Sequence, residues 1–262
     1  MISVIIPTYD AGPKLSACLY GLRQQTCRDF EVIIVNDGGR RDEYWFKWSM
    51  PDDVQLRLLY LEPPSEAFRA GAARNLGLKY ARGDRTLFVD QDCILAPDVV
   101  AEHWDMPLDH VLQGSRRHVP GTRDYSPIEI ANIQQFVCGE DRRRFMFFPP
   151  YKDAAERLAR GEYRFPIHYR FCWSFQLSVP TQLTRDLGGF WEEFGYGGED
   201  QELCWRLQQA GCTLLADFNL VAYHIDHPRR ALTGKHFELI KLSQQQPGLI
   251  RNGGKLPFLR DL

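Results

Sequence analysis

The chain has 262 residues, of which 44% are hydrophobic and 25% charged, and its formal net charge is −2. That length is enough for one α/β core, and the near-neutral charge gives no basis for a nucleic-acid or membrane-surface partner. No run approaches the roughly 20 apolar residues of a membrane span, and the start lacks the pattern of a signal peptide. Seven cysteines without a Cys-x-x-Cys pair favour a reducing cytoplasm over a disulfide framework or a zinc site.

The first third of the chain alternates expected strands and helices. Residues 14–25 carry Leu15, Cys18, Leu19 and Leu22, a spacing that places an apolar face on a helix. In chain order, we expect strands at residues 3–7, 30–35, 56–61 and 86–89, and helices at residues 14–25 and 70–80. Strands and helices at this pitch predict βαβ units and a mainly parallel sheet.

Acidic residues follow the ends of three of these strands: Asp10, Asp37, and the pair Asp90 and Asp92. Ligands of parallel sheets bind outside the carboxyl ends of the strands. A turn-forming aspartate explains each position separately, but four such acids together are hard to ascribe to chance. We therefore expect a crevice at this edge of the sheet.

Asp90 and Asp92 come directly after the apolar residues Leu87, Phe88 and Val89. Side chains alternate along an extended chain, so both carboxylates would point to the same side. Two such carboxylates are well placed to hold a hard divalent cation. The alternative is a solvated acidic turn.

The middle of the chain, residues 116–169, mixes arginine-rich and aromatic segments, including residues 142–150. We favour an ordinary insertion packed on the edge of the core. The alternative is a mobile flap over an acceptor site, because long irregular segments often carry binding loops.

A glycine-rich turn precedes Glu199 and Asp200, which would occupy the first turn of a helix that ends near Gly211. Unpaired N–H groups and the helix dipole favour acids at that position, so capping is one explanation. Capping does not explain the glycines and aromatic residues beside them, which suit a close-fitting pocket. A further strand, residues 213–222, leads to two histidines at positions 224 and 227.

In this order, the motifs resemble GT-A-fold glycosyltransferases, and in particular the large glycosyltransferase family 2 of inverting enzymes. The matching stretches are the first strand and nucleotide loop (residues 4–10, with Asp10 where asparagine is more usual), the second strand with its nucleotide-binding aspartate (30–38), the Ala-Arg-Asn helix (70–77) and the metal motif Asp90-Gln91-Asp92. Residues 196–200 also resemble the Trp-Gly-Gly-Glu-Asp acceptor motif of β-1,4-galactosyltransferases and chondroitin-type transferases, with Tyr196 in place of Trp.

The resemblance covers roughly residues 1–230 and implies a Rossmann-like nucleotide-diphospho-sugar transferase fold, with a mainly parallel central sheet flanked by helices. Residues 1–95 would form the nucleotide-binding half and residues 96–230 the acceptor-binding half. Residues 231–262 would form a C-terminal helix and tail, which could contact a membrane or a second copy of the chain.

The resemblance also implies a site for Mn²⁺ or Mg²⁺, which would neutralise a departing diphosphate. Asp92 would contact the metal directly, and Asp90 would hold the ribose or the metal's waters. His224 would complete the metal shell, with His227 as its rival.

For the nucleotide, the resemblance implies that Asp37 accepts the N3–H of uracil. Arg74 would hold the nucleotide loop or the diphosphate, although a salt bridge on the helix surface is the alternative. The expected nucleotide-binding set is Pro7, Thr8, Tyr9, Asp10, Asp37, Arg74, Asp90 and Gln91.

For the acceptor, family position makes Asp200 the general base and Glu199 a ligand of acceptor hydroxyls, beside Gly198. Trp173 and Trp191 are candidate platforms for sugar stacking, and core packing is the alternative for each.

The implied activity is metal-dependent, inverting transfer of a sugar from a nucleotide sugar, UDP-linked by expectation, to a hydroxyl of a glycan or glycoconjugate. The expected location is the cytoplasm, or the inner face of the membrane. One competing function is a sugar-phosphate nucleotidyltransferase, but that class would want a glycine-rich, basic loop where residues 8–13 stand. The other is a non-catalytic nucleotide-sugar-binding subunit, against which the intact acidic motifs argue.

Overall fold

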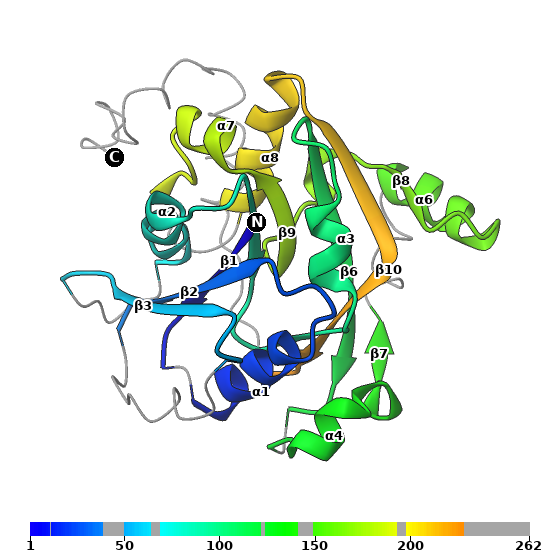
Figure 1. The fold of residues 1–262 in the computed structure, drawn as a ribbon. Coiled ribbons are helices and arrows are strands. Elements are labelled where there is room, and N and C mark those ends of the chain that lie inside the picture. Colours follow the sequence, from blue (N-terminus) through cyan, green and yellow to red (C-terminus); the bar gives the residue numbers. More distant parts are fainter. Residues whose placement is uncertain are drawn as a thin grey trace.

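A mixed β-sheet forms the centre of the molecule (Figure 1). The computed structural model describes residues 1–10, 12–38, 50–63, 69–121, 124–140, 149–192 and 198–227. The expected C-terminal helix and tail, and Tyr196 and Gly197 of the acceptor motif, lie outside the described residues. The strands are β1 (Ile2–Thr8), β2 (Phe30–Asn36), β3 (Gln55–Tyr60), β4 (Arg85–Val89), β5 (Cys93–Leu95), β6 (His110–Val119), β7 (Gly139–Glu140), β8 (Arg164–Pro166), β9 (Gln176–Pro180) and β10 (Thr213–Ile225).

The strand order is β3-β2-β1-β4-β9-β6-β10-β5, with β7 paired to β6 and β8 paired to β10. The first four strands are parallel, as the alternating pattern predicts. The second half is mixed, because β9 runs antiparallel to both β4 and β6 while β6 and β10 are parallel. The carboxyl ends of β1, β2 and β4 therefore meet at one edge, where the crevice is expected.

Helices cover both faces of this sheet (Figure 1). They are α1 (Gly12–Arg23), α2 (Ala70–Tyr80), α3 (Val99–Trp104), α4 (Pro127–Ala131), α6 (Pro149–Ala159), α7 (Thr181–Asp186) and α8 (Glu199–Gln209), with short 3-10 turns η2 (Ile133–Phe136) and η3 (Tyr169–Phe171). None of these described helices has the length and apolarity that crossing a bilayer requires.

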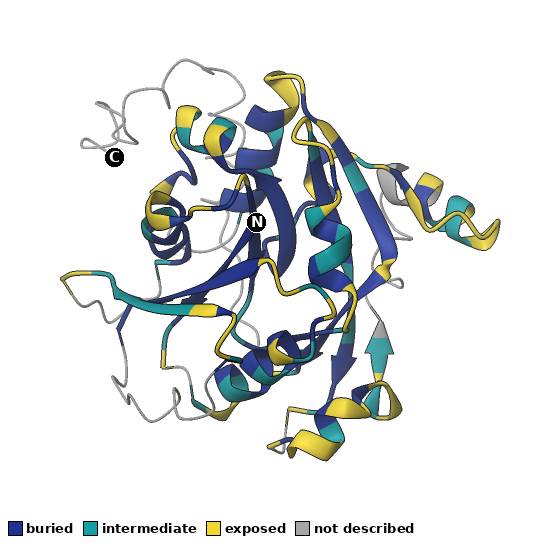
Figure 2. Ribbon diagram, viewed as in Figure 1, coloured by how far each residue is buried: buried dark blue, intermediate teal, exposed yellow. Residues whose placement is uncertain are grey.

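The two faces follow from the alternation of side chains along β1. Val4 and Ile6 pack in one apolar cluster with Leu22 of α1, whereas Ile5 packs in the other with Leu78 of α2. Val99 of α3 joins the first cluster, and Leu203 and Leu207 of α8 join the second. Figure 2 shows the central strands buried between helices whose outer surfaces are exposed, whereas β3 at the edge of the sheet is only partly buried. Each fully buried aliphatic side chain contributes about 1.5–3 kcal/mol, so the sheet is held rigidly from both sides.

The expected helix at residues 70–80 is confirmed to the residue as α2. Gly77 lets this helix approach the sheet, because a Cβ at that position would lie 2.5 Å from Ile5 Cγ2. The last strand is longer than expected: β10 continues from Ala222 to Ile225, since Tyr223 and His224 pair with β5 and β6. This extension places His224 in the sheet.

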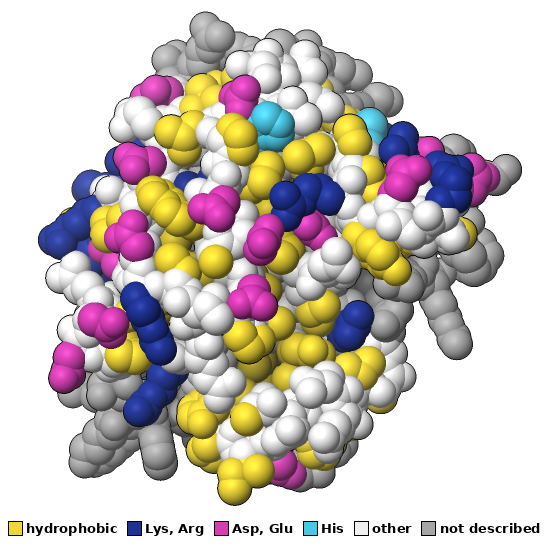
Figure 3. All heavy atoms as spheres, turned by 45° about the vertical axis from the view of Figure 1, so that its right-hand side comes forward, with side chains coloured by type: hydrophobic (Ala, Val, Ile, Leu, Met, Phe, Trp, Pro, Cys, Tyr) yellow, Lys and Arg dark blue, Asp and Glu magenta, His cyan; other side chains and the backbone are white. Residues whose placement is uncertain are grey.

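The irregular middle of the chain adds to the sheet edge. β8 pairs antiparallel with β10, and Phe165 of β8 stacks on Phe218 at 5.5 Å between ring centroids. This arrangement agrees with an insertion packed on the core. Residues 141–148 lie outside the described residues, so the flap remains a prediction. On the face shown in Figure 3, the described acidic and basic side chains are interspersed.

Candidate active site

The turns after β1, β2 and β4 are tied together at the carboxyl edge of the sheet. The N–H of Asp37 donates to Thr8 O at 2.9 Å. The side-chain amide of Gln91 accepts from Tyr9 N–H and donates to Tyr9 O, each at 3.2 Å. These contacts bring the expected nucleotide loop beside the expected metal motif. Pro7 lies within β1, directly before this loop.

Asp10 has a left-handed backbone, with φ of 52°. Asparagine and aspartate tolerate this conformation better than other non-glycine residues. The same backbone geometry therefore accommodates Asp10 and the asparagine more usual at this position.

Asp37 is fully buried, and its carboxylate forms an ion pair with Arg69. The Nε and Nη2 atoms of Arg69 lie 2.8 and 2.6 Å from Asp37 Oδ1, and the Arg69 backbone N–H donates to Oδ2. The sequence did not single out Arg69. A base bound at Asp37 would have to share the carboxylate with this arginine, so the uracil contact remains a prediction.

Arg74 is 4% exposed, so the alternative of a salt bridge on the helix surface is wrong. Its Nη1 lies 2.8 Å from Glu199 Oε1, and its Nη2 lies 3.1 Å from Asp90 Oδ1. Burial opposes the charge, but Glu199, Asp90 and Asp200 outweigh it and raise the pKa of Arg74. One guanidinium thus joins the end of β4 to the start of α8.

Asp200 is buried at the first turn of α8. Ser174 donates to its Oδ2 from N–H at 3.1 Å and from Oγ at 3.4 Å, and Gln201 N–H donates to Oδ1 at 2.8 Å. Burial and the nearby charge of Glu199 raise the pKa of Asp200 to about 7, although the charge of Arg74 opposes this shift. Such a carboxyl group can exchange a proton near neutral pH.

The N-cap of α8 is Gly198, with φ of 93°, and no side chain caps the helix there. Glu199 pairs with Arg74 instead of capping the helix. Asp200 accepts the first-turn N–H of Gln201 as well as the Ser174 N–H, so the capping explanation holds in part for Asp200. The positive φ accounts for a glycine at position 198.

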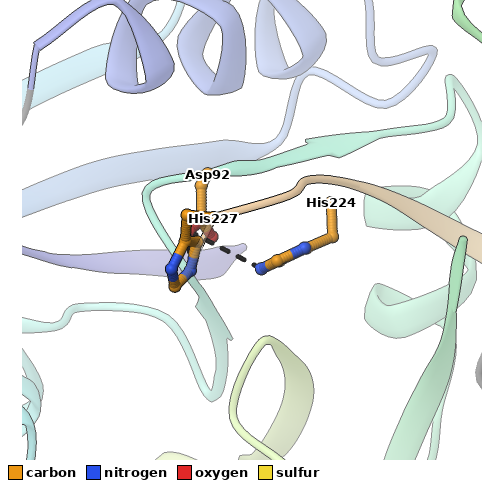
Figure 4. A group of neighbouring side chains, drawn as sticks. All are labelled: Asp92, His224 and His227. Atoms are coloured by element: carbon orange, nitrogen blue, oxygen red, sulfur yellow. Dashed lines mark ion pairs between the residues drawn. The ribbon is translucent and has the colours of Figure 1, made fainter. Parts of the chain in front are cut away.

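The metal motif is a turn, in which Cys93 N–H donates to Asp90 O at 3.0 Å. The expectation that extended backbone aligns Asp90 with Asp92 is therefore wrong. Asp90 turns to Arg74, whereas Asp92 Oδ2 lies 3.0 Å from His227 Nε2 and 3.6 Å from His224 Nε2 (Figure 4).

Asp92, His224 and His227 each offer a ligand atom, and the three atoms lie within 4.8 Å of one another. Both histidines, which the sequence left as rivals, belong to this group. Burial lowers the pKa of His224, which keeps its imidazole neutral. Although burial opposes ionisation of Asp92, the His227 hydrogen bond and the two histidine charges hold the pKa of Asp92 below its ordinary value.

A carboxylate and two imidazoles are a fitting ligand set for a divalent cation, which would bind both imidazoles in their neutral form. Imidazole nitrogen suits first-row transition metals better than Mg²⁺, which prefers oxygen ligands.

The two tryptophans differ in exposure. Trp191 is 1% exposed, so the expectation of a sugar platform there is wrong, and its ring belongs to the core. Trp173, directly before Ser174, is half-buried, and its backbone N–H donates to Gln113 Oε1 at 2.7 Å. A stacking role for Trp173 remains a prediction.

Arg116 is a second basic residue beside the metal ligands. It lies on the same side of β6 as His118, whose register partner in β10 is His224. Its guanidinium carbon stands 4.6 Å from the centroid of the Phe175 ring. Burial raises the pKa of Asp90, and the charges of Arg74 and Arg116 oppose that shift. Burial lowers the pKa of His224, and the charge of Arg116 adds to that effect. The sequence placed Arg116 only within an arginine-rich insertion; the alternation within β6 is the signal that orients it.

The fold agrees with comparisons to known proteins. Staphylococcus aureus TarS 1–349 in complex with UDP-GlcNAc superposes with a TM-score of 0.64 at 20% identity, covering 92% of this chain and 65% of that one. The mannosyltransferase PcManGT from Pyrobaculum calidifontis, in complex with GDP-Man and Mn²⁺, has a TM-score of 0.61 at 20% identity, covering 98% of this chain and 65% of that one. The expected GT-A-type α/β fold is therefore confirmed.

The chain belongs to glycosyl transferase family 2, whose model matches residues 3–159. Validoxylamine A glucosyltransferase of Streptomyces hygroscopicus subsp. jinggangensis (strain 5008) is 29% identical over 223 residues, covering 80% of this chain and 52% of that protein. The chain spans about half the length of such curated relatives.

Proposed function

We propose that this chain is a metal-dependent, inverting glycosyltransferase that moves a sugar from a UDP-sugar to a hydroxyl of a glycan or glycoconjugate. One observation carries the proposal: a buried carboxyl group with a pKa of about 7, Asp200, adjoins the Glu199–Arg74–Asp90 bridge that leads to the metal-ligand group. Family membership supports the same reaction class.

In this reaction the acceptor oxygen forms a bond to the anomeric carbon while the bond from that carbon to the diphosphate oxygen breaks. Ionised Asp200 accepts the proton of the acceptor hydroxyl, and hydrogen bonds from Ser174 and Gln201 N–H hold its carboxylate in place. A cation held by Asp92, His224 and His227 would supply positive charge beside the departing diphosphate.

Glu199 is suited to orient the acceptor. Its Oε1 is fixed by Arg74, and its buried Oε2 has no hydrogen-bond partner in the part of the chain that the structure describes. A buried carboxylate oxygen without a partner is costly, and an acceptor hydroxyl would supply the missing donor. Gly198 and Trp173 would line the acceptor site on the same side as Glu199.

For the donor, Asp37 would read the uracil edge, and Asp90 would hold the ribose or the waters of the metal. The loop of Thr8, Tyr9 and Asp10, pinned by Gln91, would pack on the nucleotide. The two structural neighbours carry UDP-GlcNAc and GDP-Man, so the fold admits either base. The choice of UDP rests on Asp37.

Thermal unfolding of the full chain with UDP-sugars, GDP-mannose and ADP-glucose, each with Mn²⁺ or with EDTA, tests this proposal. UDP-sugars should raise the melting temperature only with Mn²⁺, and Asp92→Ala should abolish that shift while the protein stays folded. An equal shift in EDTA would contradict metal dependence. Binding without release of UDP, in the presence of acceptor glycans, would favour a non-catalytic binding subunit.

A further inference from the structure

The metal-ligand histidine of β10 faces two carboxylates. Its Nε2 lies 3.6 Å from Asp92 Oδ2, and its Nδ1 lies 3.4 Å from Asp226 Oδ1 on the opposite side of the ring. His224 is 6% exposed, and its Nδ1 has no hydrogen bond within the usual limits to any residue that the structure describes. Nδ1 of His224, which faces away from the metal position, is therefore buried, and the nearby carboxylate of Asp226 can accept its proton in a hydrogen bond.

Asp226 is held in place by groups outside the metal-ligand set. His118 Nδ1 lies 2.6 Å from Asp226 Oδ1, and the Asp226 N–H donates to Val119 O at 3.0 Å. Gly121 packs so closely that a Cβ there would overlap the Asp226 carbonyl. The His118 ring meets the His224 ring edge-on, at 5.3 Å between centroids. The carboxylate is thus fixed by the end of β6.

We propose that Asp226 is a positioning residue for the metal site: it accepts the Nδ1 proton of His224 and so directs the Nε2 lone pair of His224 toward the cation. This inference rests on the metal dependence proposed above. A hydrogen bond to the outer nitrogen of a ligating histidine fixes both its tautomer and its ring orientation. A small closure of the 3.4 Å gap on metal binding would complete that bond.

The same three residues, His118, His224 and Asp226, also bring ligand atoms within 4.8 Å of one another and could hold a cation themselves. One cation in each group would require a neutral His224 to lose its single N–H proton and bind through both nitrogens. A neutral imidazole cannot do so. We therefore expect one Mn²⁺ per chain, with Asp226 behind its ligand.

Titration of the full chain with Mn²⁺, followed by the EPR signal of free Mn²⁺, measures both affinity and stoichiometry without requiring activity. Asp226→Ala should weaken Mn²⁺ binding by about 10- to 100-fold, the usual effect of removing such a support. Asp226→Asn should lose less Mn²⁺ affinity than Asp226→Ala, because the amide oxygen of asparagine accepts the same hydrogen bond without the charge. Since Asp226 is 46% exposed, both variants should fold, and circular dichroism checks that.

A matched control lies at the other end of β6. His110 Nδ1 and Asp109 Oδ1 form a second pair at 2.6 Å, at the protein surface. Asp109→Asn should leave Mn²⁺ affinity unchanged.

Equal affinity for wild type and Asp226→Ala would overturn the inference while leaving the metal site intact, provided that Asp92→Ala abolishes binding. Two Mn²⁺ per wild-type chain, one of them lost in Asp226→Ala, would also overturn it, because Asp226 would then be a ligand. Wild type that binds no Mn²⁺ would overturn both the metal site and the inference.

Discussion

Arg74 of α2 and Glu199 of α8, 125 positions apart in the chain, form a buried ion pair with 2.8 Å between Nη1 and Oε1. The same guanidinium contacts Asp90 at 3.1 Å, at the end of β4. The expected nucleotide-binding and acceptor-binding halves are thus joined by one side chain.

Arg74→Ala should lower the free energy of unfolding by about 3–5 kcal/mol, because it leaves a buried carboxylate without its cation. Urea denaturation measures this loss. The double variant Arg74→Met/Glu199→Met should lose less than the sum of the single variants, since neither charge remains. Arg157, which pairs with Asp153 on the surface, is the control: Arg157→Ala should leave the urea midpoint nearly unchanged. Equal losses for Arg74→Ala and Arg157→Ala would contradict the buried bridge.

Two glycines of α2 should respond to alanine in opposite directions. Gly77→Ala places a methyl group 2.5 Å from Ile5 Cγ2, so overpacking should cost about 1–3 kcal/mol. At Gly71 the nearest atom to an added Cβ is 3.5 Å away, and alanine should be neutral or stabilise the helix by up to about 1 kcal/mol. Melting temperatures of the two variants decide whether α2 packs on β1 as described; a stable Gly77→Ala variant would show that it does not.

The transfer rate should depend on pH through Asp200, whose pKa is about 7. The base must be ionised, so kcat/KM should rise with pH and level off above about 7. The contribution of Asp200 to the free energy of unfolding should change in the opposite direction and fall as pH rises. The folded protein binds this proton more tightly than the unfolded chain does, so Asp200 adds stability in acid that is lost as pH rises from about 4 to about 7. Asp200→Asn should lack that part of the slope. A rate that is flat between pH 5 and 8 would exclude Asp200 as the titrating base.

Base preference should depend on Asp37. UDP should compete better than GDP or ADP for the nucleotide site, and Asp37→Asn should reduce that preference by roughly 1.5–3 kcal/mol, the value of a hydrogen bond to a charged group. Because Arg69 also contacts Asp37, the melting temperature of Asp37→Asn must be recorded alongside its affinities. Stronger competition by GDP against wild type would show that Asp37 does not read uracil.

Much of the fold could be predicted from the local pattern of apolar residues in the sequence. The sequence pattern predicted α2 to the residue and placed the first four strands. The apolar spacing expected at residues 14–25 gave α1, which the structure places at Gly12–Arg23, because burial of one face imposes a period visible in sequence. The end of β10 was missed, since residues 223–225 join the sheet through pairing with distant strands.

The partners of the site residues could not be predicted. Arg74 pairs with Glu199, and Asp37 with Arg69, across sequence separations of 125 and 32 positions that local pattern does not span. Both His224 and His227 belong to the metal-ligand group because β10 ends beside the turn at Asp92, which is likewise a tertiary contact. Residue types and order could suggest the chemistry; tertiary contacts decide which oxygens and nitrogens meet.

The catalytic role of Asp200 is tested most directly by measuring UDP release from a UDP-sugar, in the presence of Mn²⁺ and acceptor, for wild type and Asp200→Asn. The amide is nearly isosteric but cannot take the proton. The variant should therefore bind UDP-sugar as wild type does, melt at a similar or higher temperature, and lose about 10²- to 10⁴-fold in turnover. An Asp200→Asn protein that keeps wild-type turnover, with unchanged donor binding, would contradict the account.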